Sequence, residues 1–566
     1  MLGRQRHLSL ICYRPNSEVL VTLPDNLDAV LKLEIGEQSE RRSRQTLGNA
    51  FSRAQVLDHT PEKWITWKYT HCHCKYLWTA SAGLGLTKCK GGRMQHSAHA
   101  APAAGEEPAL LGRAGLPAET VTSWLEARPE VDSNFDRDTA AFLRFWRMSA
   151  ELRAKLPAKP VRNKAQAVAS GVIFQAERQA RERFLGSHID TVYRKLTNDC
   201  RNFVRAEKLV GDAAALLPGL VPDAELLAQE SERLLKDKEG LEVDQGIFLS
   251  HVLGHSSASR HLCHAMLLPG PETLDRLPYF RKHGAIDLGA AAVLRLGKAS
   301  VVEMRNPRFL NALDDTTLDA LETAVDLAIL DPETSAAVLR GGLVEHPKYA
   351  GRRVFSAGIN LTHLYHGKIS YLFYIKHVLG FENKIFRGLA QVDLPPDETA
   401  GATTEKPWIA TVDAFAIGGG CQHLLVMDYV LAAADAYMKL PARKEGIIPG
   451  AANMRLPRFT GDRIARQAIM YGRRLDCDSP EGRLICDEVA PPDEMDAALT
   501  RVIDGLTSSG VVSAVANRRG FRVAQEPLDL FLNYLAVYAR EQAYCHFSPA
   551  LVANLEQHWN AQSREV

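Results

Sequence analysis

The sequence of 566 residues lacks the features of several specialised protein classes. It has no run of about 18 apolar residues, so we predict no transmembrane helix. The 68 lysines and arginines nearly equal the 67 acidic residues, and the net charge of +1 argues against a broad nucleic-acid or anionic-membrane surface. The 10 cysteines follow no regular spacing, which in a chain of this length indicates reduced thiols and a cytoplasmic location.

The densest group of metal-ligating residues is also unlike a known site. It consists of His71, Cys72, His73 and Cys74, with Cys89 further along. Zinc sites usually leave two to four residues between paired cysteines. These four residues follow one another directly, so we expect no metal there.

Residues 1–116 show little sustained periodicity and no apolar core of a secretory signal. We expect an extension that is either poorly ordered but genuine, or non-native with Met94 as the true start.

Residues 117–285 predict a mostly α-helical domain. Ile189, Val192, Tyr193 and Leu196 recur at the spacing of one helix face. The stretch VPDAELLAQESERLLKDKEG predicts a further helix that stops at Gly240. The sequence of this domain alone does not indicate a catalytic activity.

His188 and Asp190 have the H-x-D spacing of a two-histidine, one-carboxylate iron site. On a helix, residues two apart point about 200° from each other. We therefore expect an exposed histidine and an exposed aspartate on either side of Ile189. A metal-dependent oxygenase using this pair stays as an alternative.

From Ile286 the pattern changes to short apolar runs separated by helical stretches. AAVLRLGK and SVVEM predict two strands, and a helix with buried Leu318, Leu321, Val325 and Ile329 should follow, capped by Asp314 or Asp315. SAAVLRGG, WIATVDAFAI and YVLAAAD predict further strands. Residues 286–540 therefore predict an α/β domain of ββα units, followed by a helical tail over 541–566.

Two turns with small residues each follow an apolar strand. One is FSAGINL, Phe355 to Leu361, and the other is AIGGGCQ, which begins at Ala416. Glycines let a ligand approach the backbone, and two N–H groups that converge on one oxygen make an oxyanion hole. The turns together predict such a site, although either turn alone is weak evidence.

These turns, with RNPRFLNALDD and GIIPGAANMRLPR in the same order, resemble the crotonase superfamily, the enoyl-CoA hydratases and isomerases. The resemblance implies a spiral of ββα units, an acyl-CoA ligand, and assembly as homotrimers or homohexamers. It implies that the N–H groups of Ile359 and Gly419 bind the thioester oxygen. It places Ala357, Gly358, Asn360, Gly418 and Gly420 around the substrate, and weakly implies that Arg305, Asn306 and Arg308 bind CoA.

The resemblance also shows what is missing. Hydratases of this superfamily carry two glutamates, where this chain has Gln422 and Ala442. Neither replacement can donate and recover a proton at neutral pH, so hydration is not expected. Glu445 is three residues further on and would need a helical turn to reach the site; we do not expect it to take the role.

The chain is most similar to members of the superfamily that act as cofactor-independent dioxygenases on (3,5-dihydroxyphenyl)acetyl-CoA. The resemblance then implies an enolate that reduces O₂, an arylglyoxylate and free CoA as products, no metal or organic cofactor, and a place in antibiotic biosynthesis through arylglycines. Gln422 would bind an oxygen-bearing intermediate or a ring hydroxyl. Leu313 stands where that pattern has a glutamate, and Lys376 and His377 occupy the neighbourhood of its arginine, which leaves the ring substitution open.

Two further alternatives remain. The same oxyanion hole would serve thioester hydrolysis, and a non-catalytic CoA-binding protein would keep the fold. We expect no nucleic-acid or membrane partner in either case.

Overall fold

The computed structural model describes residues 8–14, 17–23, 64–69, 72–77 and 105–565, and side chains from 105 onward. The chain divides into two compact units, Met1–Met94 and Gln95–Val566. In the first unit β1 (Leu8–Arg14) pairs with β2 (Ser17–Leu23), and β3 (Trp64–Tyr69) pairs with β4 (Cys72–Leu77), both antiparallel. The cysteine- and histidine-rich stretch and the predicted start at Met94 lie outside the residues whose side chains are described.

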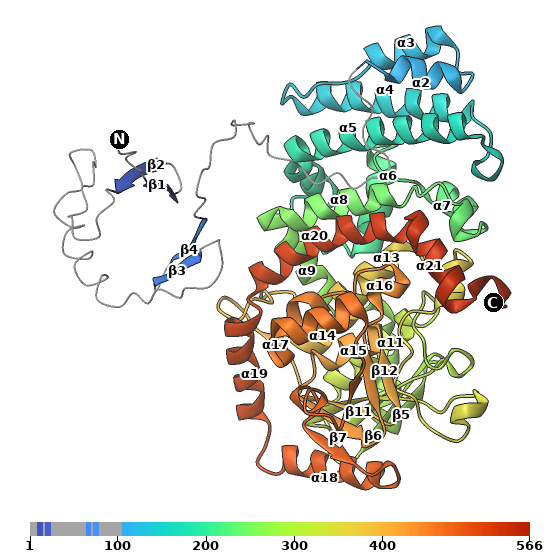
Figure 1. Cartoon of the computed structure of the whole chain (residues 1–566). Helices are drawn as coiled ribbons and strands as arrows, with labels where there is room; N and C mark the ends of the chain where they lie inside the picture. The colour runs from blue at the N-terminus through green and yellow to red at the C-terminus, as the bar shows by residue number, and fades with distance from the viewer. Residues whose placement is uncertain (1–7, 15–16, 24–63, 70–71, 78–104, 566) are drawn as a thin grey trace, which may run out of the picture. The chain divides into compact units, whose positions relative to one another are not determined.

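The second unit begins with a stack of helices (Figure 1). Their bounds are α2 (Glu107–Arg113), α3 (Ala118–Glu126), α4 (Phe135–Ala154), α5 (Lys164–Leu196), α6 (Ala206–Leu216), α7 (Ala224–Ser231), α8 (Val243–Gly254), α9 (Ser256–Leu267) and α10 (Pro271–His283). α5 is the longest, and a reciprocal capping box between Asn163 and Gln166 starts it. The predicted helical domain is confirmed, but its helices begin at Glu107 and not at 117.

A seven-stranded sheet follows, in the order β16-β13-β11-β8-β7-β6-β5. The strands β5, β6 and β7 pair antiparallel, and the remaining pairs are parallel. Their bounds are β5 (Ala285–Asp287), β6 (Ala291–Leu296), β7 (Ala299–Met304), β8 (Ala336–Gly341), β11 (Trp408–Val412), β13 (Tyr429–Ala433) and β16 (Glu488–Ala490). β8 and β11 are buried throughout, as expected for central parallel strands.

A second sheet has the order β12-β14-β15 and stands behind the glycine turns. Its strands are β12 (Phe415–Ile417), β14 (Tyr437–Lys439) and β15 (Leu475–Asp476), and a separate pair is β9 (Leu389–Ala390) with β10 (Thr403–Thr404). The helices between and after the strands are α11 (Leu318–Leu330), α12 (Leu361–Tyr365), α13 (Tyr371–Ile375), the π-helix η6 (Lys376–Glu382), α14 (Asn383–Arg387), α15 (Gly419–Leu424), α16 (Ala442–Glu445), α17 (Ala452–Tyr471), α18 (Met495–Thr507), α19 (Val512–Gln525), α20 (Leu528–His546) and α21 (Pro549–Trp559). The predicted α/β arrangement of ββα units behind a helical part is confirmed.

The helical part and the α/β part join through α20, which lies along α8 (Figure 1). Gly246 makes this contact possible, because a Cβ there would lie 2.4 Å from the Cβ of Ala543. Tyr371 of α13 is held in the same layer: its hydroxyl donates to the carbonyl of Ala539 at 2.8 Å, and its N–H donates to Glu242 at 2.6 Å. α20 also runs across the predicted boundary at 540, so the tail is no separate domain.

Three expectations about local structure were wrong. Thr317 stands at the N-cap position of α11 and makes no side-chain capping hydrogen bond, while the Asp314 side chain accepts from the N–H of Thr316 in the preceding turn. α7 ends at Ser231 and not near Gly240, because the Glu230 carboxylate accepts the N–H groups of Glu239 and Gly240 and folds the chain back.

The third concerns His188, which is buried and not exposed. Its Nε2 lies 2.6 Å from Asp138 Oδ2, across 50 residues of sequence. Asp190 instead pairs with Arg194 at the surface. The two side chains therefore point apart, and the iron site proposed as an alternative is not formed by this pair.

Among the residues that the structure describes, none of the helices has the length and apolar character of a membrane span.

Candidate active site

The two glycine-containing turns meet in space. Ser356 forms a parallel bridge with Ala416, and the N–H of Ile417 donates to the carbonyl of Ser356 at 2.9 Å. A Cβ on Gly358 would lie 3.1 Å from the backbone nitrogen of Gly419. The same Cβ would lie 2.7 Å from the carbonyl oxygen of Ile417, which is too short, and Gly358 also has a φ of +82°, so the position requires glycine. The predicted convergence of the turns is therefore present.

The backbone directions leave two N–H groups free to face a ligand. Leu313 forms a parallel bridge with Ile359. The N–H of Leu313 donates to the carbonyl of Gly358, and the carbonyl of Leu313 accepts from the N–H of Asn360. In such a parallel bridge the N–H of Ile359 points away from Leu313. Gly419 is the first residue of α15, where a helical N–H has no intrahelical acceptor. Both residues line one pocket.

The three glycines at the start of α15, the N-cap Gly418 and the helical Gly419 and Gly420, are required for different structural reasons. Gly418 has φ +53° and ψ −117°, a conformation that side chains disfavour. A Cβ on Gly420 would lie 2.9 Å from both Cβ and O of Ser356, so this glycine permits close packing of the two turns. Gly418 and Gly419 line the pocket, and Gly420 lies behind it.

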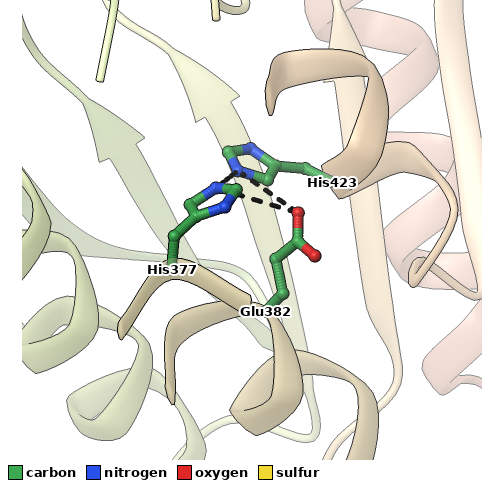
Figure 2. Close-up of side chains that lie close together, drawn as sticks. All are labelled: His377, Glu382 and His423. Atoms are coloured by element: carbon green, nitrogen blue, oxygen red, sulfur yellow. Dashed lines mark hydrogen bonds and ion pairs between the residues drawn. The ribbon is translucent and has the colours of Figure 1, made fainter. Parts of the chain in front are cut away.

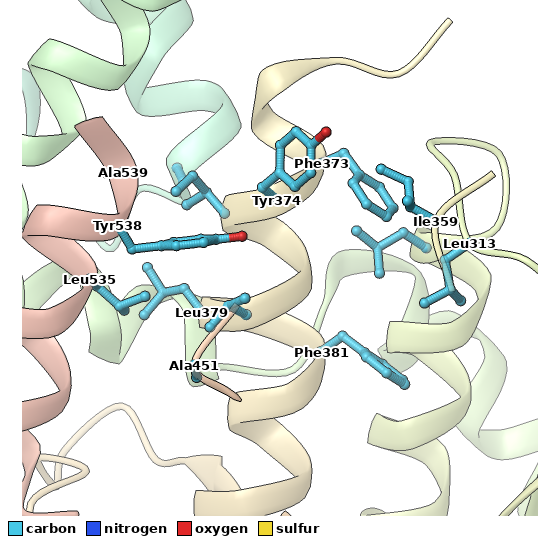
Figure 3. Packing of buried hydrophobic residues seen from close by; sticks show 14 of the residues in the cluster. Leu313, Ile359, Phe373, Tyr374, Leu379, Phe381, Ala451, Leu535, Tyr538 and Ala539 are labelled. Carbon is cyan, nitrogen blue, oxygen red and sulfur yellow. The ribbon is translucent and has the colours of Figure 1, made fainter. Parts of the chain in front are cut away.

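The pocket beside these glycines is largely apolar and aromatic. It is lined by Leu313, Ile359, Phe373, Tyr374, His377, Gly418, Gly419, Gln422, Leu440, Pro441, Ala442, Glu445, Ile447, Ile448, Pro449, Gly450 and Tyr538. Leu313 lies closest to the oxyanion glycine, since a Cβ on Gly419 would be 3.1 Å from its Cδ1. Figure 3 shows Leu313 and Ile359 on one side of the helix that carries Phe373 and Tyr374, and Tyr538 on the other.

Glu445 reaches this pocket, contrary to the expectation from the sequence. The residues Ala442 to Glu445 form α16, and one turn of helix brings Glu445 to the face of Ala442. A Cβ on Gly418 would lie 3.9 Å from Glu445 Oε1. Among the described residues, no hydrogen bond or ion pair holds this carboxylate. Burial raises the pKa of Glu445 to about 7, and the positive charge of Lys439 opposes the shift only in part.

Gln422 follows on α15 and also lines the pocket. Its Oε1 would lie 3.3 Å from a Cβ on Gly450. In the described part of the chain its amide makes no side-chain hydrogen bond, so both its donor and its acceptor are free for a ligand. The role predicted for Gln422 stays a prediction.

Comparison with known proteins gives the family. Residues 297–525 match the family model described as enoyl-CoA hydratase/isomerase. A protein of Amycolatopsis orientalis, (3,5-dihydroxyphenyl)acetyl-CoA 1,2-dioxygenase, is 45% identical over 394 residues, which are 69% of this chain and 89% of that protein. The chain belongs to the enoyl-CoA hydratase/isomerase family.

More distant relatives are hydratases. The short-chain-enoyl-CoA hydratase of Clostridium acetobutylicum is 27% identical over 236 residues, 41% of this chain and 81% of that protein. A solved enoyl-CoA hydratase from Mycobacterium avium subsp. paratuberculosis is 21% identical, with a TM-score of 0.40, and covers 48% of this chain and 98% of its own. The resemblance to this family that the motifs predicted is confirmed.

The family match ends before α20, yet α20 supplies part of the pocket wall. Tyr538 lines the pocket, and its hydroxyl would lie 3.1 Å from a Cβ on Gly450. The hydroxyl of Tyr374 lies 2.9 Å from Nδ1 of His546, also on α20. Sequence reasoning missed both tyrosines, because their place depends on the packing of a distant helix and not on a local pattern.

His377 lines the pocket, and its side chain is buried. Its Nε2 lies 2.8 Å from Nε2 of His423, and both face Glu382 (Figure 2). Burial lowers the pKa of His377 to about 3 and holds the pKa of His423 well below its usual value, so both rings are neutral. Burial also raises the pKa of Glu382 to about 8. Lys376, its neighbour in sequence, pairs with Asp319 and does not line the pocket.

Several predicted site residues lie near the pocket without lining it. Asn360 caps α12 by accepting from the N–H of His363, and its amide donates to Asp314 at 2.9 Å. The N–H of Ala357 donates to the carbonyl of Leu310. Both residues shape the turn around Gly358, and neither offers a side chain to the pocket.

The residues predicted for CoA binding do not line this pocket. Arg305 and Asn306 line a second, surface pocket. Arg305 is paired there with Glu303 at 2.7 Å and Asp287 at 3.0 Å, so its charge is already neutralised. The Arg308 guanidinium lies over the ring of Phe309, 5.1 Å from its centroid. The assignment to CoA stays a prediction.

Proposed function

We propose that this enzyme is a dioxygenase that converts an arylacetyl-CoA and O₂ to an arylglyoxylate and CoA. The first candidate substrate is (3,5-dihydroxyphenyl)acetyl-CoA, by its 45% identity to the relative of that name. The observation that supports the proposal most is the combination at one pocket of two convergent N–H groups with Gln422 and Ala442. Such a pocket stabilises an enolate but lacks the pair of acids that hydration requires.

The first step is removal of the α-proton. The thioester oxygen accepts hydrogen bonds from the N–H groups of Ile359 and Gly419, and negative charge that develops on it is stabilised by the start of α15. We assign the removal of this proton to Glu445, whose unpaired carboxylate faces the same pocket. A carboxylate with a pKa of about 7 is a stronger base than an ordinary glutamate and is still ionised in part at neutral pH.

The second step consumes O₂. The enolate gives its electrons to O₂, and a bond forms between the α-carbon and one oxygen, which yields a peroxide. The distal oxygen attacks the thioester carbon and CoA leaves as the thiolate. Loss of the second α-proton then breaks the O–O bond and leaves an arylglyoxylate. One substrate and one O₂ account for all atoms of the two products.

The enolate supplies the electron pair that forms the peroxide, and the second α C–H bond supplies the pair that breaks the O–O bond. Because the substrate supplies all four electrons, we propose that no metal or organic cofactor takes part in the reaction. Gln422 donates to the peroxide oxygen or to a ring hydroxyl. The apolar wall and α20 keep water away from the reactive intermediates. Leu313 and His377 would contact the ring, and an apolar neighbour such as Leu313 favours a ring with fewer hydroxyls on that side.

The remaining expectations extend the same proposal. Assembly as trimers or hexamers and CoA contacts from Arg305, Asn306 and Arg308 follow from the family resemblance, and a cytoplasmic location follows from the irregular cysteine spacing. An arylglyoxylate has the carbon skeleton of an arylglycine, so we propose that the product feeds the synthesis of arylglycine-containing antibiotics.

The test uses the full chain, an oxygen electrode and three thioesters: phenylacetyl-CoA, its 3-hydroxy and its 3,5-dihydroxy derivatives. Uptake of one O₂ per CoA released, with arylglyoxylate in equal amount, supports the proposal, and the fastest thioester identifies the ring. Release of CoA and arylacetate without O₂ uptake would show a thioester hydrolase instead. Binding of all three without turnover would leave only a CoA-binding protein.

A further inference from the structure

The buried cluster of His377, His423 and Glu382 is formed by an unusual piece of backbone. In an α-helix, residues five apart point about 140° away from each other. His377 and Glu382 lie in the π-helix η6, whose hydrogen bonds run from i to i+5 and whose wider turn brings residues five apart toward the same face. This rare geometry, which recurs at functional sites, turns both side chains toward His423 of α15 (Figure 2).

The three side chains present one donor atom each to a shared point. Nε2 of His377 lies 2.8 Å from Nε2 of His423, and these nitrogens lie 3.8 and 3.9 Å from Oε1 of Glu382. Those separations define one position in the plane of the three atoms that is about 2.1 Å from each, the length of a bond from zinc to nitrogen or oxygen. A water oxygen hydrogen-bonds at about 2.7–3.0 Å and is too large for this position.

Hydrogen bonds alone do not satisfy the cluster. Only one proton fits between the two Nε2 atoms, and a neutral imidazole has one donor and one acceptor. Oε1 of Glu382 is then left without a donor, although all three residues are at least nine-tenths buried. Unpaired buried polar atoms are rare in native proteins, and an ion at the shared position would give all three inward-facing atoms a partner.

The surroundings are those of a metal site as well. The other oxygen of Glu382 accepts from Arg455 at 3.1 Å, which fixes the carboxylate as outer hydrogen bonds fix metal ligands. The rings of Phe355, Phe373 and Phe381 pack around the two imidazoles and exclude water. Two imidazoles and one carboxylate suit divalent ions such as Zn²⁺ or Fe²⁺, whereas Ca²⁺ and Mg²⁺ prefer oxygen ligands alone.

We propose that His377, His423 and Glu382 bind one divalent first-row transition-metal ion. The ion would tie η6 to α15, the helix that carries Gly419 and Gln422. Of the three ligands only His377 lines the pocket. Metal on its Nε2 would place the ring proton on Nδ1 and fix the orientation of the ring, so the ion positions a pocket residue. This inference does not depend on the proposed function.

The test measures zinc in the full chain. Protein stripped with a chelator is loaded with Zn²⁺, freed of excess by gel filtration, and assayed by mass spectrometry of the metal. We expect one Zn²⁺ per chain for the wild type and for H346Q, an exposed histidine, and at least a tenfold loss of bound zinc in E382Q and in H423Q. An unchanged zinc content in both cluster variants would overturn the proposal, since that zinc would lie elsewhere, for example near Cys72.

A second measurement avoids variants that fail to fold. X-ray absorption of zinc-loaded wild type should show nitrogen and oxygen neighbours at about 2.0–2.1 Å with two imidazole signatures. Sulfur neighbours, or no zinc retained by the wild type, would contradict the proposal. Oxygen uptake by stripped and loaded protein reports separately on the function: uptake that needs added metal would leave this site standing and refute the metal-independent reaction.

Discussion

Ala442 and Glu445 lie one helical turn apart on α16, and both line the pocket beside Gly418. The chain therefore has no carboxylate where the resemblance to the hydratases expects one, but a carboxylate enters the same pocket from the next turn. A shifted carboxylate reaches a different part of the ligand. This shift suits removal of a proton next to the thioester better than the addition of water across a double bond.

Replacing Glu445 tests its role as the base. E445Q should exchange the α-protons of an arylacetyl-CoA with D₂O about 10²–10⁴ times more slowly than the wild type, because an amide does not accept the proton. The exchange is followed by NMR without oxygen, so that it reports on the enolate alone. E494Q, at an exposed glutamate, is the control. Exchange at the wild-type rate in E445Q would exclude Glu445 as the base.

The pKa of Glu445 predicts a pH profile. Since the base works only when ionised, kcat/KM should rise tenfold per pH unit below about 7 and level off above it. The proton-exchange rate should follow the same curve. A profile that is flat from pH 5.5 to 8.5 would contradict this assignment.

The same shift affects stability. A raised pKa means that the folded state holds the proton more tightly than the unfolded state, so the contribution of Glu445 is lost as the pH rises from its ordinary value of 4.5 through about 7. E445Q should therefore be more stable than the wild type at pH 8, by on the order of 2–3 kcal/mol, and similar to it at pH 4.5. Urea titrations at both pH values measure the difference, and an equal difference at both would refute it.

The meeting of the two turns depends on Gly358. In G358A the new Cβ would lie 2.7 Å from the carbonyl of Ile417, and the backbone would be strained at φ +82°. We expect about 1–3 kcal/mol of destabilisation and, because one oxyanion donor moves, a fall in kcat of about 10²–10³. G171A in α5 is the control, as nothing lies within 4 Å of its new Cβ. Thermal melts of G358A and G171A measure the change in stability, and steady-state turnover of the same variants measures the change in kcat.

The contact between α8 and α20 makes a further prediction. G246A would press its Cβ to 2.4 Å from Ala543, whereas the Cβ of G254A on the same helix would meet Ala536 at an ordinary 3.8 Å. G246A should push α20 outward, lower the stability by about 1–3 kcal/mol, and admit water to the pocket beside Tyr538. The measurement is the ratio of arylglyoxylate to CoA released, which should fall below one in G246A and stay at one in G254A.

The sequence predicted what depends on local pattern. The strands, α11 and the two glycine turns all follow from periodicity and from residues with special backbone freedom. It did not predict what depends on partners far along the chain. His188 is buried because it hydrogen-bonds to Asp138, and Tyr538 reaches the pocket because α20 packs against α8. Glu445 was discounted because its position depends on whether a four-residue stretch completes one helical turn.

The position of α20 has a consequence for biosynthesis. During translation both glycine turns leave the ribosome before α20, so the wall that Tyr538 contributes is the last part of the pocket to be synthesised. A chain that ends before α20 would carry both turns but not this wall.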